Sequence, residues 1–233
     1  MADHRIDVHL RVADSNEDIT VNYNAGGNNT VTLTAGLYKS LALLCAEVQT
    51  QLQTVHASLT CTESDGVVTI AGTATFTITW DHPSLRDWLG WATNLSAANS
   101  YVAPSQSPGT FVATLPWETL NYGWMWTTKR WEGHHQTGGS IKLGKVSMWQ
   151  VNARLTQTEL DDEFRNPMSY LLQGKAARWW RNDADNTAWS YTNWDGFVDV
   201  ILAGDMADYA EQWLNPSNIV LSAMVPLRFV VHG

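Results

Sequence analysis

The sequence predicts an α+β fold of antiparallel sheets, β-sandwich-like, with one long helix in each half and long hairpins. Several short segments alternate apolar and polar side chains, which is the period of a half-buried strand. Turn residues join some of these segments at hairpin spacing. One segment in each half instead shows a helical pattern, and both halves follow the order strands, helix, strands, short helix.

The N-terminal segments predict antiparallel strands. Residues 5–12 alternate, and the face that we expect to be buried consists of Ile6, Val8, Leu10 and Val12. Residues 18–34 alternate on both sides of a turn at 25–29, which indicates a hairpin with a longer loop.

A helix is expected over residues 36–55. Its apolar stripe consists of Leu37, Leu41, Leu44, Val48, Leu52 and Val55. After it, Asp65-Gly66 is a tight-turn pair between two strands, and residues 73–80 alternate as a third strand. A short helix is expected at 84–91, carrying Leu85, Trp88, Leu89 and Trp91. We expect the third strand and the short helix to pack on helix 36–55 and close a small core.

Residues 92–121 carry little charge and are rich in Ser, Ala and Pro. This composition indicates an extended connector, with short strands near Val102 and Phe111. We place the domain boundary in this connector. The division gives an N-terminal α+β domain at residues 1–110 and a Trp-rich C-terminal α+β domain at residues 111–233.

The C-terminal domain begins with an alternating segment that contains Trp124 and Trp126. A hairpin tip at 134–140 and a long strand at 141–156 follow. A helix is expected at 158–173, with Pro167 predicting a break or kink inside it. The remaining elements are a strand at 196–202, a short helix at 206–214 and a closing strand at 218–231.

Charge and hydropathy limit the classes of partner. The formal net charge is −9 and no basic run occurs, so we expect no sequence-specific nucleic-acid binding, which requires clustered Lys and Arg. No secretory-signal pattern and no apolar run of transmembrane length occurs, so we expect no membrane partner. Cys45 and Cys61 lack metal-ligand spacing, and we expect free, buried thiols in a protein made in the cytoplasm.

The sequence lacks the common catalytic patterns. It has no P-loop, no G-x-G-x-x-G after a strand, no G-x-S-x-G and no H-E-x-x-H. His134 and His135 are adjacent, and adjacent residues of a strand point to opposite faces, so we expect a solvated loop there instead of a metal site. The acidic residues between 159 and 163 fit a helix N-terminus. The sequence therefore predicts no catalytic residue, no metal and no cofactor.

Tryptophan is frequent, with 13 residues, most of them in the second half of the chain. Charged residues make up only 16%, where about 25% is usual, and such a surface suits a chain that is covered by neighbours. Trp is enriched both in cores and in protein–protein interfaces. We therefore predict a subunit interface formed by Trp124, Trp126, Trp131, Trp179 and Trp180.

Four motifs occur in order between residues 30 and 105: a Gly-x-Tyr-x-Ser helix start, a V-T-I strand, an F-x-I/L-x-W strand and a Leu-Leu-Gly-aromatic corner. Their residues here are Gly36, Tyr38, Ser40, Val68, Thr69, Ile70, Phe76, Ile78, Trp80, Leu85, Leu89, Gly90 and Trp91. Trp88 stands where another Leu is expected. With these motifs the segment resembles structural proteins of tailed-bacteriophage virions, in the tail or neck.

The resemblance implies a non-enzymatic virion structural protein that is made and assembled in the host cytoplasm. Its expected partners are copies of itself and other virion proteins. We expect a homo-oligomer that forms a ring or a stacked tail or neck assembly, with a tail-tube-like arrangement favoured. The alternatives are a carbohydrate-binding module of a host-recognition tip, a capsid decoration protein, and a hydrolase with a noncanonical site.

Overall fold

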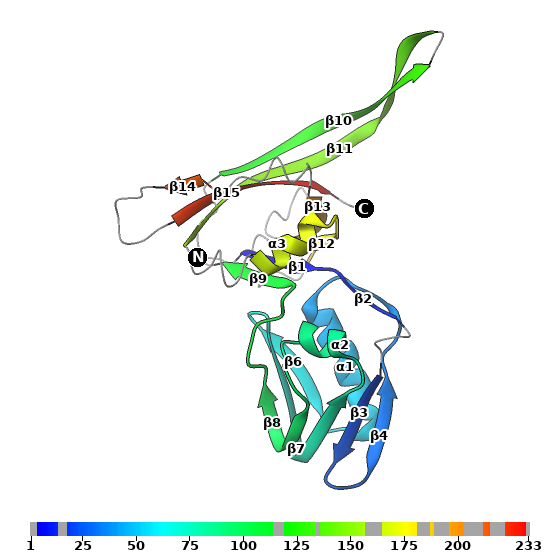
Figure 1. Ribbon diagram of the computed structural model, residues 1–233, viewed down its shortest axis with the longest axis vertical. Coiled ribbons are helices and arrows are strands. Elements are labelled where there is room, and N and C mark those ends of the chain that lie inside the picture. Colours follow the sequence, from blue (N-terminus) through cyan, green and yellow to red (C-terminus); the bar gives the residue numbers. More distant parts are fainter. Residues whose placement is uncertain are drawn as a thin grey trace.

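The computed structural model describes residues 4–13, 18–113, 119–133, 136–156, 165–180, 187–188, 196–202, 212–214 and 222–231. Within these ranges the chain forms three antiparallel sheets and three helices. We call the eight-stranded sheet the larger sheet and the five-stranded sheet the smaller sheet, and the third sheet has two strands. The larger sheet occupies the upper part of Figure 1, and the smaller sheet with its two helices occupies the lower part. The prediction of an α+β fold dominated by antiparallel sheets is confirmed.

The larger sheet has eight strands in the order β10-β11-β15-β13-β12-β1-β9, with β14 paired to β15. These strands are β1 (His4–Val8), β9 (Thr110–Ala113), β10 (Thr119–Gly133), β11 (Gln136–Thr156), β12 (Ala177–Trp180), β13 (Phe197–Leu202), β14 (Gln212–Leu214) and β15 (Ser222–Val231). Pro226 pairs with Asn152 of β11 and lies between the parts of β15 that pair with β14 and β13. Its missing N–H therefore costs no ladder bond on that side.

The smaller sheet has five strands in the order β4-β3-β7-β6, with β8 paired to β7. These strands are β3 (Asp18–Tyr23), β4 (Asn28–Thr32), β6 (Thr60–Ser64), β7 (Val67–Trp80) and β8 (Leu95–Val102). Both hairpins expected here are confirmed. Their turns contain residues with positive φ, among them Asn24 and Ala25 in the first and Asp65 and Gly66 in the second.

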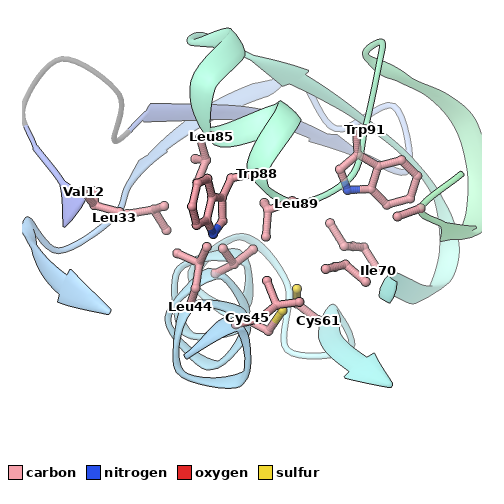
Figure 2. Packing of buried hydrophobic residues seen from close by; sticks show 14 of the residues in the cluster. Val12, Leu33, Leu44, Cys45, Cys61, Ile70, Leu85, Trp88, Leu89 and Trp91 are labelled. Atoms are coloured by element: carbon pink, nitrogen blue, oxygen red, sulfur yellow. The ribbon is translucent and has the colours of Figure 1, made fainter. Parts of the chain in front are cut away.

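Helices α1 (Leu41–Val55) and α2 (Pro83–Trp88) pack with the smaller sheet in one hydrophobic core. Figure 2 shows Leu85, Trp88 and Leu89 directed toward Leu44 on α1. The stripe of α1 is buried at Leu41, Leu44, Val48 and Leu52, and each such side chain contributes about 1.5–3 kcal/mol when it leaves water. The predicted third strand at 73–80 is not separate, because it continues the preceding strand within β7. Its apolar residues and those of the short helix do share the core with α1, as predicted.

The start of the long helix was predicted wrongly. Residues 36–38 form strand β5 (Gly36–Tyr38), which pairs with β2 (Leu10–Val12) in the two-stranded sheet. The helix begins after Ser40, whose hydroxyl accepts a hydrogen bond from Leu43 N. A serine N-cap and strand pairing outweigh the helical spacing of Leu37, which is 57% exposed.

Residues 5–12 form two strands where one was predicted. β1 belongs to the larger sheet and β2 to the two-stranded sheet. The change occurs at His9, whose N–H donates to Ala176 O while the N–H of Val8 donates to Gly109 O. Ile6 and Val8 nevertheless face the core, as their alternation predicts.

The second half contains a long hairpin but no long helix among the described residues. α3 (Arg165–Leu172) lies within the predicted helix 158–173 and contains Pro167, and Gln173 is in a turn. Residues 212–214 are a strand, β14, where a short helix was predicted, because they pair with β15. The strands predicted at 196–202 and 218–231 are present at 197–202 and 222–231.

The chain starts in the larger sheet with β1, builds the smaller sheet, and returns to the larger sheet at β9. β1 opens the chain, yet it pairs with β9 on one side and with β12 on the other. Residues 18–102 between them build the smaller sheet. The division into domains at 110 and 111 stays a prediction.

Candidate subunit interface and a buried polar junction

The β10–β11 hairpin is the longest feature of the larger sheet. β10 contains 15 residues and β11 contains 21. In Figure 1 the hairpin extends well beyond the other strands of its sheet. β10 is the end strand, and among the described residues it pairs with β11 alone. Its outer edge therefore presents backbone N–H and C=O groups without a strand partner.

Three of the five tryptophans predicted for a subunit interface lie on this end strand. Trp124 is opposite Ser147, Trp126 is opposite Lys145 and Trp131 is opposite Gly139 in the β10–β11 register. The sequence pattern predicted a strand for Trp124 and Trp126, which is confirmed, and the structure adds Trp131 to the same strand. Only the tertiary structure shows that this strand is the edge of the sheet.

Trp179 and Trp180 are in a different environment. They lie on β12 opposite Ile6 and Arg5 of β1, and they are only 1% and 5% exposed. The chain's own residues already exclude water from these two indole rings. The candidate interface that we carry forward is therefore Trp124, Trp126 and Trp131, while Trp179 and Trp180 belong to the core.

A buried ionic cluster joins the larger sheet to the smaller one. The Arg5 guanidinium donates to both carboxylate oxygens of Asp7, at 3.0 and 2.9 Å, and to Glu63 Oε1 at 2.9 Å. The carboxylate of Asp7 also accepts a hydrogen bond from Leu41 N, at the start of α1, at 3.0 Å. A negative charge is favourable at this position because the N-terminus of a helix is its positive end.

A second cluster surrounds Asp199 on β13. Its carboxylate accepts a hydrogen bond from Arg178 Nε at 2.9 Å and from Lys39 Nζ at 2.6 Å, and His9 Nε2 lies at 3.5 Å. Partial burial raises the pKa of the Asp199 carboxyl, but the contacts with His9, Arg178 and Lys39 lower it more. The net pKa lies well below the usual range for Asp, so this carboxylate stays ionised near neutral pH.

The two clusters meet at a cavity of about 370 Å³ that is lined by residues from both sheets and from the N-terminal turn of α1. Burial lowers the pKa of Arg5, but Asp7 and Glu63 raise it more, so its charge is permanent. Arg178 lies over the ring of Phe197, with 3.9 Å between Cζ and the ring centroid. Each carboxylate is held by cations, and none is placed as a general base. We interpret the clusters, together called the polar junction, as structural.

Sequence reasoning missed the polar junction. Arg5, Asp7 and His9 alternate along the N-terminal strand, opposite its apolar face, and all three are buried. Such an alternation of charges is a signal that this strand is covered on both faces. The other residues of the polar junction, however, lie far from this strand in the sequence, among them Lys39 and Asp199.

Two serine–histidine pairs in the structure resemble part of a catalytic site. Ser58 Oγ lies 2.8 Å from His56 Nδ1, and Ser84 Oγ lies 2.9 Å from His82 Nδ1. In both cases the backbone N–H of the serine donates to the same ring nitrogen. The pairs sit at the end of α1 and at the start of α2. The repeated geometry is that of a capping turn, so neither pair is interpreted as a catalytic dyad.

The described residues contain no cluster of three or more His, Cys, Asp or Glu side chains that could hold a metal ion. His134 and His135 lie outside the described residues, as do the acidic residues between 159 and 163. None of the described helices is long and apolar enough to cross a membrane. The chain matches no protein-family model, no curated protein and no solved structure.

Proposed function

We propose that this chain is a non-enzymatic structural protein of a tailed-phage virion that self-associates through the β10–β11 hairpin into a ring or a stacked tail or neck assembly. The observation that carries this proposal is the length and composition of the edge strand β10. Residues 119–128 of this strand contain no charged residue, and residues 119–133 contain no proline.

Natural proteins usually protect the edge of a sheet, because unpaired backbone groups invite another strand. Charged side chains, proline, bulges and short edge strands are the common protections. The strand at the other end of the sheet is β9, of which the structure describes four residues. From Thr119 to Thr127, β10 has no charge, no proline and a regular register with β11, which is expected of an edge that a neighbouring subunit covers. The register shifts and the charged residues of β10 follow after Thr127.

The energy of such a contact is adequate for assembly. Standard interfaces bury about 1,600 Å², and each buried Å² of apolar area contributes about 25 cal/mol before the cost of association. Closed symmetry repeats one contact around a ring, so a modest interface is multiplied. Trp124, Trp126 and Trp131 supply aromatic residues of the kind that dominate such contacts.

The resemblance within residues 30–105 supports a structural role and no chemistry. Several of its residues are core or capping residues in the structure: Phe76, Ile78, Leu85 and Leu89 are buried, and Ser40 caps α1. We propose that the partners are copies of this chain and other virion proteins, and that the protein resides in the virion after assembly in the host cytoplasm.

The test is the assembly state of the full chain, measured by mass photometry and by negative-stain electron microscopy. Two proline variants, Met125→Pro and Trp126→Pro, sharpen it. Backbone N–H groups alternate between the two sides of a strand, so one of these variants removes only an outward N–H while the other breaks the hairpin ladder. We expect the variant that lacks only an outward N–H to fold normally and to lose assembly.

The matched control is the same pair of substitutions on the edge strand β4, Asn29→Pro and Thr30→Pro, where we expect assembly to persist in the variant that folds. A wild-type chain that stays a monodisperse monomer at high concentration would contradict the proposal. Saturable quenching of Trp fluorescence by a glycan in such a monomer would instead support the carbohydrate-binding alternative.

A further inference from the structure

The two cysteines of the chain lie side by side in the core between the smaller sheet and α1. Cys45 is on α1 and Cys61 is on β6, and they are 2% and 3% exposed. Both are free thiols. Figure 2 shows their sulfur atoms side by side between the helix and the strand. The two thiols are close enough for Cys61 to raise the pKa of the Cys45 thiol above its usual range.

The backbone around the pair is held in place from both elements. Gln49, one helical turn after Cys45, accepts a hydrogen bond from the backbone N–H of Cys61 through Oε1 at 3.0 Å. Leu44 and Val48 on the same helix are fully buried, which fixes the rotation of α1 over the sheet. The register of α1 on β6 is therefore defined at the position of the two sulfur atoms.

We propose that Cys45 and Cys61 form a covalent modification site, at which an intramolecular disulfide staples α1 to β6 when the chain meets a low-molecular-weight disulfide. In the first step a protein thiolate attacks the reagent disulfide, forms a mixed disulfide and releases one reagent thiolate. In the second step the other protein cysteine, as a thiolate, attacks the protein sulfur of the mixed disulfide and releases the second reagent thiolate. The protein loses two protons and two electrons, and the reagent is reduced to two thiols.

The side-by-side placement of the two sulfur atoms (Figure 2) is what a disulfide, with its S–S distance of about 2.0 Å, requires. Burial makes the reduced pair slow to react. The neighbouring Cys61 thiol, and next burial, raise the pKa of the Cys45 thiol far above its usual range, and the thiolate is the reactive form. Exchange therefore requires α1 to open from β6, and the thiols persist in a reducing compartment.

The disulfide would close the segment from Cys45 to Cys61, which contains most of α1 and the start of β6. A loop of this size restricts the unfolded chain and stabilises the folded one. For a chain of 233 residues we expect the thermal midpoint to rise by about 5–10 °C. The inference concerns the core alone and does not depend on the proposed assembly.

The experiment uses the full chain, oxidised glutathione and a urea concentration just below the unfolding transition. We expect both thiols to disappear in a denaturing thiol assay, the mass to fall by two hydrogen atoms without a glutathione adduct, and the thermal midpoint to rise. A reductant should reverse all three changes. Cys45→Ser and Cys61→Ser are matched controls that should each stop at the mixed disulfide and gain no stability.

Two results would overturn the inference. One is a chain that keeps both thiols, or that accumulates only mixed or intermolecular disulfides, under these conditions. The other is an intramolecular disulfide that lowers the thermal midpoint, since this would show that the native contact cannot accommodate the bond. Neither result bears on the assembly of the wild-type chain, which is measured separately in reductant.

Discussion

The carboxylate of Asp7 on β1 accepts a hydrogen bond from the backbone N–H of Leu41, the first residue of α1, at 3.0 Å. The same carboxylate is paired with Arg5, which also holds Glu63 on β6. One strand of the larger sheet thus caps the main helix of the smaller one and binds one of its strands. We infer that this contact fixes how the two sheets are oriented.

Replacement of Asp7 by alanine tests this relationship. Asp7 is 1% exposed, and its loss leaves the buried Arg5 with one carboxylate instead of two and leaves Leu41 N without an acceptor. We expect the free energy of unfolding to fall by about 3–5 kcal/mol, which is typical when one partner of a buried ion pair is removed. Urea denaturation followed by circular dichroism measures the change.

The control for Asp7 is Asp81→Ala. Asp81 is exposed, and among the described residues its carboxylate accepts long hydrogen bonds from Thr20, at 3.4 and 3.5 Å. We expect a change below about 0.5 kcal/mol. Equal effects of the two substitutions would refute a special role for Asp7.

Asp199 predicts a pH dependence of stability. Its pKa in the folded chain lies below the value of about 3.9 that an unfolded Asp has. As pH falls, the unfolded state therefore binds this proton first. The contribution of Asp199 to the free energy of unfolding is present above about pH 5 and decreases progressively below it.

The variant Asp199→Asn isolates this contribution. We expect it to be less stable than the wild type at neutral pH and the difference to shrink steadily between about pH 5 and pH 2. The measurement is a series of urea titrations of both proteins across this range. A difference that is independent of pH would show that the ion pairs with Lys39 and Arg178 do not stabilise the fold.

Gly90 is required by the corner that follows α2. It has φ of +82°, and a Cβ on it would lie 2.2 Å from the backbone oxygen of Ser105. We expect Gly90→Ala to cost about 2–5 kcal/mol, from a left-handed backbone and from overpacking together. The shift of the urea unfolding midpoint, at an unchanged slope of the free energy against urea concentration, measures this loss of stability.

Gly27→Ala is the matched control. Gly27 has φ of +103°, and nothing lies within 4 Å of the site of its Cβ. We therefore expect only the backbone cost, about 1–2 kcal/mol. If both variants lose the same stability, the close approach of Ser105 is not a constraint on this corner.

Much of the smaller unit could be predicted from local pattern. The stripe of Leu41, Leu44, Val48 and Leu52 has the helical period, and Asp65-Gly66 is a strong turn signal. Both elements can therefore be predicted without tertiary information. Leu37 fits the same helical spacing but lies in a strand. Spacing alone could not exclude it, because the pairing of β5 with β2 depends on a segment far earlier in the chain.

The candidate interface was predicted in part. The frequency of Trp indicated a role in contacts, but indole rings serve cores and interfaces equally well. Sequence could not separate Trp179 and Trp180, which β1 and its neighbours bury, from the tryptophans of β10. Which strand ends a sheet is a property of topology, so no local pattern records it.

The sequence by itself determined the local elements: where apolar residues repeat with a period of two or of about 3.6, and where turns and caps interrupt them. The tertiary structure decided which elements became neighbours. Lys39 meets Asp199 and Asp7 meets Leu41 only because β1 pairs with β12 and β9 across most of the chain. Local periodicity reflects forces between residues a few positions apart, whereas these contacts depend on how the whole chain closes on itself.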